Sequence, residues 1–140
     1  MSEGNPSDPN AAVPRLRFPR RARVRLQREY AHVYRAGGRA RGRFILVVAA
    51  ASLNPPPKGP EPRLGLSVGR KYHRHAVKRN RARRVLREAF RLARPHLPAL
   101  DYILIPQMGQ MDWNAQEVAR ELQKLAAKAQ RKYEVKCAAS

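Results

Sequence analysis

The chain has 140 residues, enough for one domain with a modest hydrophobic core. Thirty lysines and arginines stand against ten acidic residues, which gives a formal net charge of +20 at pH 7. Such a surface repels itself until a polyanion neutralises it, so the composition favours nucleic acid or an anionic membrane as the partner.

The N-terminal part of the chain is expected to be a disordered, basic arm over residues 1–22, because it is rich in proline and polar residues and then in arginine. From Leu26 the pattern becomes helical, with Tyr30, Val33 and Tyr34 on one face. The Gly37-Gly38 pair is expected to end this first helix.

Two strands are expected next. The apolar run "FILVVAAAS" (44–52) is typical of a strand that is buried on both sides. The segment "RLGLSVGR" (63–70) alternates, with every second residue apolar, and we expect it to pair antiparallel with the first strand. The proline-rich segment 52–62 between them is predicted to be a loop.

The second half of the chain predicts a helix from Ala76 to Arg94, a strand at 101–106 and a last helix. Asn114 and Glu117 have the spacing of a helix N-cap and its partner. The order α-β-β-α-β-α predicts an α+β fold, a single-domain two-layer sandwich with a mixed sheet.

The helix at 76–94 has an unusual charge distribution. Residues 76–91 hold six arginines and one lysine against one acid, Glu88. At 100° per residue the apolar side chains collect on one face, and Asn80 lies with five arginines on the other. Like charges three or four residues apart cost about 0.2–0.5 kcal/mol per pair, so we expect phosphates to neutralise this face.

Three other interpretations of this helix were weighed. A face that serves solubility alone would include glutamates between the arginines. A membrane-surface helix would need the apolar face that the strands of the domain also need. A DNA-reading helix would come with helix-turn-helix or zinc-finger spacing, which the sequence lacks.

Other candidate functional residues are few. Tyr30 and Tyr34, four residues apart, either pack on the sheet or offer a stacking surface to unpaired bases. His73 and His75 lie among cations, which disfavours a metal site. No serine or cysteine nucleophile stands in a recognisable motif and no carboxylates are paired, so we predict no catalytic residue and no metal ligand.

The domain is expected to cover residues 23–132, followed by a flexible tail at 133–140. One cysteine, Cys137, excludes an internal disulfide and favours a reducing compartment. No apolar run approaches the roughly 20 residues that span a bilayer, and the first residues do not resemble a secretory signal. We therefore expect a soluble, cytoplasmic protein.

The segment "GLSVGRKYHRHAVKRNRARRVLREAFR" (65–91) resembles the signature of the bacterial ribonuclease P protein subunit family. That signature is a G-x-S-V strand, a basic pair, a short turn and a helix that carries R-N-R. The resemblance extends from about Arg23 to Lys132. It implies a fold of the ribosomal protein S5 domain 2-like class, with a left-handed β-α-β crossover in place of the usual right-handed one.

The resemblance also implies a function. Ribonuclease P removes the 5′ leader from precursor tRNA, and a catalytic RNA with bound Mg²⁺ performs the hydrolysis. The chain would be its protein subunit, with no catalytic residue, no cofactor of its own and no need for a protein partner or a membrane.

The resemblance implies two binding surfaces. The leader would lie in a cleft between the first helix and the sheet, lined by Tyr30, Tyr34 and Phe44. The residues expected to bind RNA are Arg70, Lys71, Arg79, Asn80, Arg81, Arg83, Arg84, Arg87 and Arg91.

Two rival functions stay open at this point, a structural ribosomal protein bound to ribosomal RNA and a DNA-compacting basic protein. The turn before the basic helix also departs from the family pattern, which has glycine and asparagine where this chain has Arg74 and His75. Arginine adopts positive φ less readily than glycine, and histidine is a poorer N-cap than asparagine.

Overall fold

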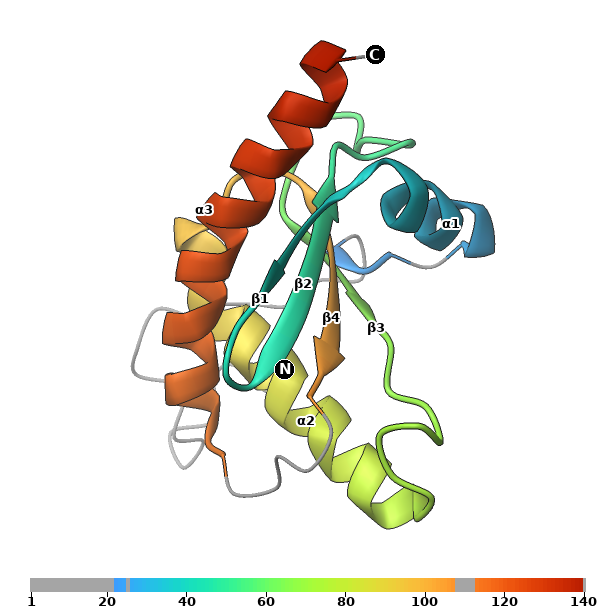
Figure 1. The fold of residues 1–140 in the computed structure, drawn as a ribbon, viewed down its shortest axis with the longest axis vertical. Coiled ribbons are helices and arrows are strands. Elements are labelled where there is room, and N and C mark those ends of the chain that lie inside the picture. The colour runs from blue at the N-terminus through green and yellow to red at the C-terminus, as the bar shows by residue number, and fades with distance from the viewer. Residues whose placement is uncertain (1–21, 25, 108–112, 140) are drawn as a thin grey trace, which may run out of the picture.

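The computed structural model describes residues 22–24, 26–107 and 113–139 (Figure 1). The basic arm expected at 1–22 therefore lies outside the described residues, apart from Ala22. The elements in chain order are α1 (Gln27–Ala36), β1 (Gly38–Arg41), β2 (Ile45–Ala50), β3 (Arg63–Leu66), α2 (Ala76–Ala93), the short 3-10 helix η3 (Arg94–His96), β4 (Asp101–Pro106) and α3 (Ala115–Ala139).

Four strands form one mixed sheet in the order β1-β2-β4-β3. β2 pairs antiparallel with β1 on one side and with β4 on the other, and β3 pairs parallel with β4. β1 was not predicted from the sequence, because its residues "GRAR" carry no large apolar side chain. Its burial nevertheless alternates, with Arg39 and Arg41 exposed, as in a strand that has one face covered.

The expected antiparallel pairing of the strands at 63–70 and 44–52 is wrong. β4 lies between them, and β3 ends at Leu66. Because β1 and β4 occupy both edges of β2, β3 cannot pair with β2, and it joins the sheet at the free edge of β4. The chain then returns through α2, and the β3-α2-β4 crossover has the left-handed sense that the resemblance implied (Figure 1).

Helices α2 and α3 lie side by side over one face of the sheet (Figure 1). Their buried side chains, among them Leu86, Phe90 and Leu122, pack on Val47 and Leu104 of the sheet to form the main core. This layer of helices on a mixed sheet is the predicted sandwich. In addition, α1 lies on the opposite face and covers only part of it.

The start of α3 follows the prediction, but its end does not. The Glu117 N–H donates to Asn114 Oδ1 at 2.9 Å, which is the expected N-cap. The helix then continues to Ala139, so the flexible tail expected at 133–140 is helical as far as the description reaches. One reason is a contact with α1, since Lys136 Nζ donates to the carbonyl oxygens of Arg35 (3.2 Å) and Gly37 (3.0 Å).

Candidate RNA interface

The face of α2 that points away from the core carries most of the predicted RNA-binding residues. The apolar side is buried as expected, at Ala82, Leu86, Ala89, Phe90 and Ala93. On the other side, Asn80, Arg81 and Arg84 are exposed, and the arginines near them are half-buried. We call this surface the cationic face; it consists of Asn80, Arg81, Arg83, Arg84, Arg87 and Arg91.

Some arginines of the cationic face are held in place by the protein itself. Arg83 donates from Nη1 to Asn80 Oδ1 and from Nη2 to the Val68 carbonyl, both at 2.8 Å. Arg91 forms a bidentate pair with Glu88, at 3.0 and 2.6 Å. These bonds hold the Arg83 guanidinium between Asn80 and the Val68 carbonyl, whereas the Glu88 carboxylate largely balances the charge of Arg91.

Arg87 marks the point where positive charges converge. Partial burial, together with the nearby guanidinium groups of Arg23, Arg83 and Arg84, lowers the pKa of Arg87. Arg23 comes from the segment that runs beside β3, as its bridge to Leu64 shows, so two distant parts of the chain contribute to this cluster. An arriving phosphate would relieve this mutual repulsion.

The turn between β3 and α2 is closed by Arg79. Its Nη1 donates to the carbonyl oxygens of His73 (3.0 Å) and Arg74 (2.8 Å). Among the described residues, none other than glycine has a positive φ. Arg74 therefore takes its place in the turn without the left-handed backbone conformation that glycine favours. His75 occupies the N-cap position of α2 without a side-chain cap. Arg79 is thus engaged in the turn.

Arg70 and Lys71, predicted to bind RNA, are exposed in the same turn, beside the start of α2. They therefore extend the positive surface beyond the cationic face at its N-terminal end.

The same turn predicts a dependence of stability on pH. His73 Nδ1 accepts the His75 N–H at 3.1 Å, and partial burial with the charges of His75, Lys78, Arg74 and Arg79 lowers the His73 pKa from 6.5. A lowered histidine pKa means that stability present above about pH 6.5 is lost as the pH falls through the folded-state pKa.

We therefore expect the melting temperature of the free protein to fall between about pH 7.5 and pH 5.5, and to fall less in His73→Asn. Asparagine can still accept the His75 N–H through its side-chain oxygen, but it does not titrate. Thermal unfolding of both proteins at the two pH values checks this. An equal fall in both would show that His73 does not contribute.

The face of the sheet that carries α1 is only partly covered. Across the strands, Arg39, Val48, Ile103 and Gly65 form one row, which α1 covers with Val33 and Tyr30. The next row is Arg41, Leu46 and Ile105, where Arg41 is exposed and the two apolar side chains are half-buried. We call this uncovered row, with Tyr30, Tyr34 and Arg39 beside it, the α1-side face.

The two tyrosines of α1 have different surroundings. Tyr30 lies on Gly65, where an added Cβ would come within 3.0 Å of its ring, and its hydroxyl oxygen accepts the Leu66 N–H at 3.1 Å. Burial raises the pKa of Tyr30. Tyr34 is half-buried, with the Arg39 guanidinium 5.8 Å from its ring centroid. Tyr30 therefore anchors α1 to β3, whereas Tyr34 borders the uncovered row.

The expectation that Phe44 lines the same cleft is wrong. Phe44 is only 6% exposed and belongs to the core on the α2 and α3 side. Its ring stacks on Trp113, with centroids 6.3 Å apart and an angle of 18° between the planes. Strand alternation would place Phe44 on the same side as Leu46, but β2 begins only at Ile45, so the alternation does not extend to Phe44.

Sequence reasoning missed Arg39, Arg41, Leu46 and Ile105 of the α1-side face. The first two belong to the unforeseen strand β1. Leu46 lies in the run 44–52, which was expected to be buried on both sides, and for Ile105 only a strand was predicted. The alternation of arginine with glycine and alanine in residues 38–41 was the available signal.

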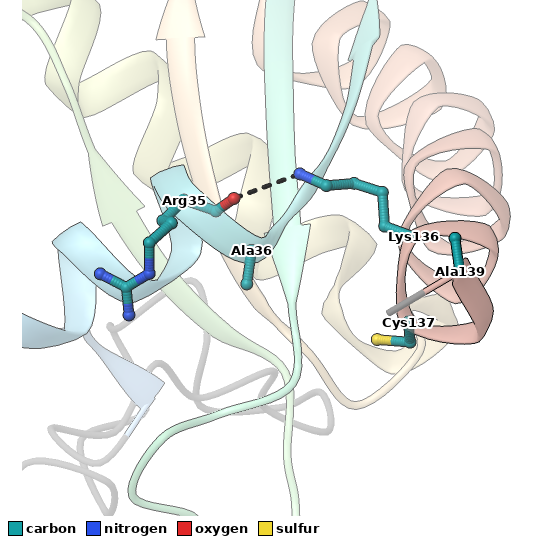
Figure 2. Close-up of a pocket in the computed structure, with 5 residues that line it drawn as sticks. All are labelled: Arg35, Ala36, Lys136, Cys137 and Ala139. Atoms are coloured by element: carbon teal, nitrogen blue, oxygen red, sulfur yellow. Dashed lines mark hydrogen bonds between the residues drawn. The ribbon is translucent and has the colours of Figure 1, made fainter.

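A separate pocket of about 330 Å³ lies between the C-terminal ends of α1 and α3 (Figure 2). It is lined by Arg35, Ala36, Lys136, Cys137 and Ala139. Figure 2 shows Lys136 reaching across to the Arg35 carbonyl while the Arg35 guanidinium points away. This pocket therefore reflects how the two helix ends meet.

Within the described residues, no three or more His, Cys, Asp or Glu side chains gather as metal ligands would. None of the helices described is both long enough and apolar enough to cross a membrane.

A mixed sheet with an arginine-rich crossover helix defines a small basic domain of the kind that binds a polyanion. A family model described as Ribonuclease P matches residues 18–130. The chain belongs to the ribonuclease P protein family.

Individual relatives agree with this assignment. The chain is 40% identical over 92 residues to a ribonuclease P protein component of Bordetella petrii, and the matched region covers 66% of this chain and 75% of that protein. It is 33% identical over 112 residues to one from Escherichia coli, covering 79% and 89%. The solved ribonuclease P protein of Thermotoga maritima has the same fold, with a TM-score of 0.63 at 24% identity over 76% of this chain and 96% of that one.

Proposed function

We propose that this chain is the protein subunit of a ribonuclease P that removes the 5′ leader from precursor tRNA. In this proposal the cationic face of α2 binds the catalytic RNA, and the α1-side face binds the single-stranded leader. The observation that carries it is that the cationic face lies on one side of α2, opposite the buried apolar side, where phosphates would offset the repulsion between its arginines. Family membership favours this function over the ribosomal and DNA-compacting alternatives.

The α1-side face suits a single strand of RNA. Tyr34 offers an aromatic ring to an unpaired base, and such stacking contributes about 1–3 kcal/mol per base. Arg39 and Arg41 stand on the same side at a spacing of two residues and can neutralise backbone phosphates. Leu46 and Ile105, half-buried between them and β3, provide an apolar floor.

Hydrolysis in this proposal belongs to the RNA, which would bind the Mg²⁺ that activates the attacking water. The part played by this chain is to bind and orient. Arg84 and Arg87 would hold the catalytic RNA, Asn80 would offer its amide to a base edge or a sugar hydroxyl, and the α1-side face would hold the leader beside the RNA.

Tyr34→Ala tests the leader-binding part. We expect holoenzyme made with this variant to lose about tenfold in affinity for precursor tRNA, because the stacking of one base is lost, and to bind mature tRNA as before. Tyr34→Phe is the matched control, since it keeps the ring and should retain the affinity. The measurement is equilibrium binding of both RNAs at one fixed salt concentration.

An equal loss for precursor and mature tRNA would mean that the Tyr34 ring supports the fold and does not contact the leader. A loss with Tyr34→Phe as large as with Tyr34→Ala would point to the hydroxyl group and contradict stacking.

A further inference from the structure

The apolar contact of helix α1 with the sheet comes from three side chains, Val33, Tyr30 and Tyr34. Of its ten residues, only Glu29 and Val33 are buried. A buried valine contributes about 1.5–3 kcal/mol, and the half-buried rings of Tyr30 and Tyr34 add to it. The other buried residue of α1 is a carboxylate, so polar contacts also fix where α1 lies.

Glu29 makes these contacts at the N-terminal end of α1, where it is 4% exposed. Its Oε1 accepts the Leu26 N–H at 3.1 Å, which closes the first turn of the helix. Its Oε2 lies 2.9 Å from Arg63 Nη2 and also accepts from Asn54 Nδ2 at 3.3 Å. One carboxylate thus joins the helix to the edge strand β3 and to the loop that precedes it.

Arg63 connects this carboxylate to the interior of the sheet. It is 7% exposed and sits beside Asp101, its partner in the parallel register of β3 and β4. Arg63 Nε lies 3.0 Å from Asp101 Oδ1, and Arg63 Nη2 donates to Asp101 Oδ2 at 3.3 Å. A third nitrogen, Nη1, donates to the Asn54 carbonyl at 3.3 Å.

Among the described residues, the cluster brings the carboxylates of Glu29 and Asp101 together around the guanidinium of Arg63 in a buried site. Asp101 is fully buried, and desolvation raises its pKa, with Arg63 acting in the opposite direction and Glu29 in the same one. A buried charge that loses its partner costs far more than an exposed one. Each member therefore constrains the other two, and a change at Glu29 alters the contacts that hold α1.

We propose that Glu29, Arg63 and Asp101 are positioning residues for leader binding, because they fix α1 on the sheet and thereby set the place of Tyr30 and Tyr34. Glu29 directly precedes Tyr30, whose hydroxyl is bonded to β3 only three residues beyond Arg63. The effect on leader binding rests on the function proposed above for the α1-side face. The effect on the position of α1 does not depend on that function.

Glu29→Gln tests this proposal. The change keeps an oxygen that can accept the Leu26 N–H but removes the charge that faces Arg63. The matched control is Glu61→Gln, which removes the charge from another partly buried pair, formed with Arg94 Nη2 at 3.2 Å, on the side of α2. Glu29→Ala serves as a second variant, because a glutamine amide could retain a bond to Arg63.

Two measurements are made on each full-length variant. Hydrogen exchange compares the amides of α1 with those of α3, and we expect faster exchange confined to α1 in the Glu29 variants but not in Glu61→Gln. The second measurement is the affinity of the holoenzyme for precursor tRNA and for mature tRNA. The ratio of the two affinities is the gain due to the leader. We expect the Glu29 variants to reduce that gain about fivefold, part of the stacking of one base, with binding of mature tRNA unchanged.

The outcomes separate the two proposals. If both Glu29 variants retain wild-type exchange in α1 and the wild-type leader gain, the positioning proposal is overturned while the proposed function stands. If exchange rises equally in α1 and α3, the cluster serves global stability, and positioning is again overturned. If α1 alone loosens but the wild-type protein shows no leader gain, the cluster positions α1 and the proposed leader binding fails.

Discussion

Replacing Arg84 and Arg87 together by alanine should weaken binding of the chain to its catalytic RNA about 100-fold. Arg84 is exposed on the cationic face, and Arg87 lies where four guanidinium groups converge. A hydrogen bond to a charged group contributes at least about 1.5 kcal/mol, so the loss of two phosphate contacts corresponds to about two powers of ten. The salt dependence should also fall, by about 0.7–0.9 in log–log slope for each lost contact.

Lys124→Ala with Lys128→Ala is the matched control, because it removes the same charge from exposed positions on α3. We expect this pair to bind RNA within about threefold of the wild type with nearly the same salt slope. Filter binding or fluorescence titration across a series of salt concentrations measures both quantities. Equal losses in the two double variants would show that net charge alone, and not the cationic face, determines binding.

Gly38→Ala should destabilise the fold by about 2–3 kcal/mol, the upper part of the range for overpacking. Gly38 begins β1 where α3 crosses it, and an added Cβ would collide with the Ala129 carbonyl and lie 2.5 Å from the Tyr133 amide nitrogen. Both are backbone atoms of α3, so no side-chain rotation relieves the contact, and α3 must move away from β1.

The control for this change is Gly69→Ala, since an added Cβ there meets nothing within 4 Å. Urea denaturation of both variants measures the difference. A Gly38→Ala protein as stable as the control would mean that α3 is not packed against β1 as closely as the structure shows.

The long elements were predictable because their own residues carry the pattern. α2 shows an apolar stripe with a helical period and is followed by a proline, and both its ends and its buried face match the prediction. The strand β1 could not be found in this way. Four residues of small and basic character become a strand only because β2 offers them an edge, which is a contact between distant parts of the chain.

The same distinction holds for the candidate site, where features within one helix were predictable and contacts between elements were not. The order of residues in α2 identified the cationic face, since a helix places its side chains at known angles. The sequence did not show that Arg79 closes the turn or that Arg83 binds Val68, because these contacts depend on the path of the turn. The cluster of Glu29, Arg63 and Asp101 could not be predicted for a similar reason, because its members come from three separate elements.

The most direct test of the proposed function is cleavage of precursor tRNA by a cognate catalytic RNA at low Mg²⁺, with and without the purified chain. A subunit that binds the catalytic RNA through the cationic face and the leader through the α1-side face should raise the cleavage rate at concentrations of Mg²⁺ where the RNA alone is nearly inactive. Cleavage at the same rate with and without the chain would contradict it.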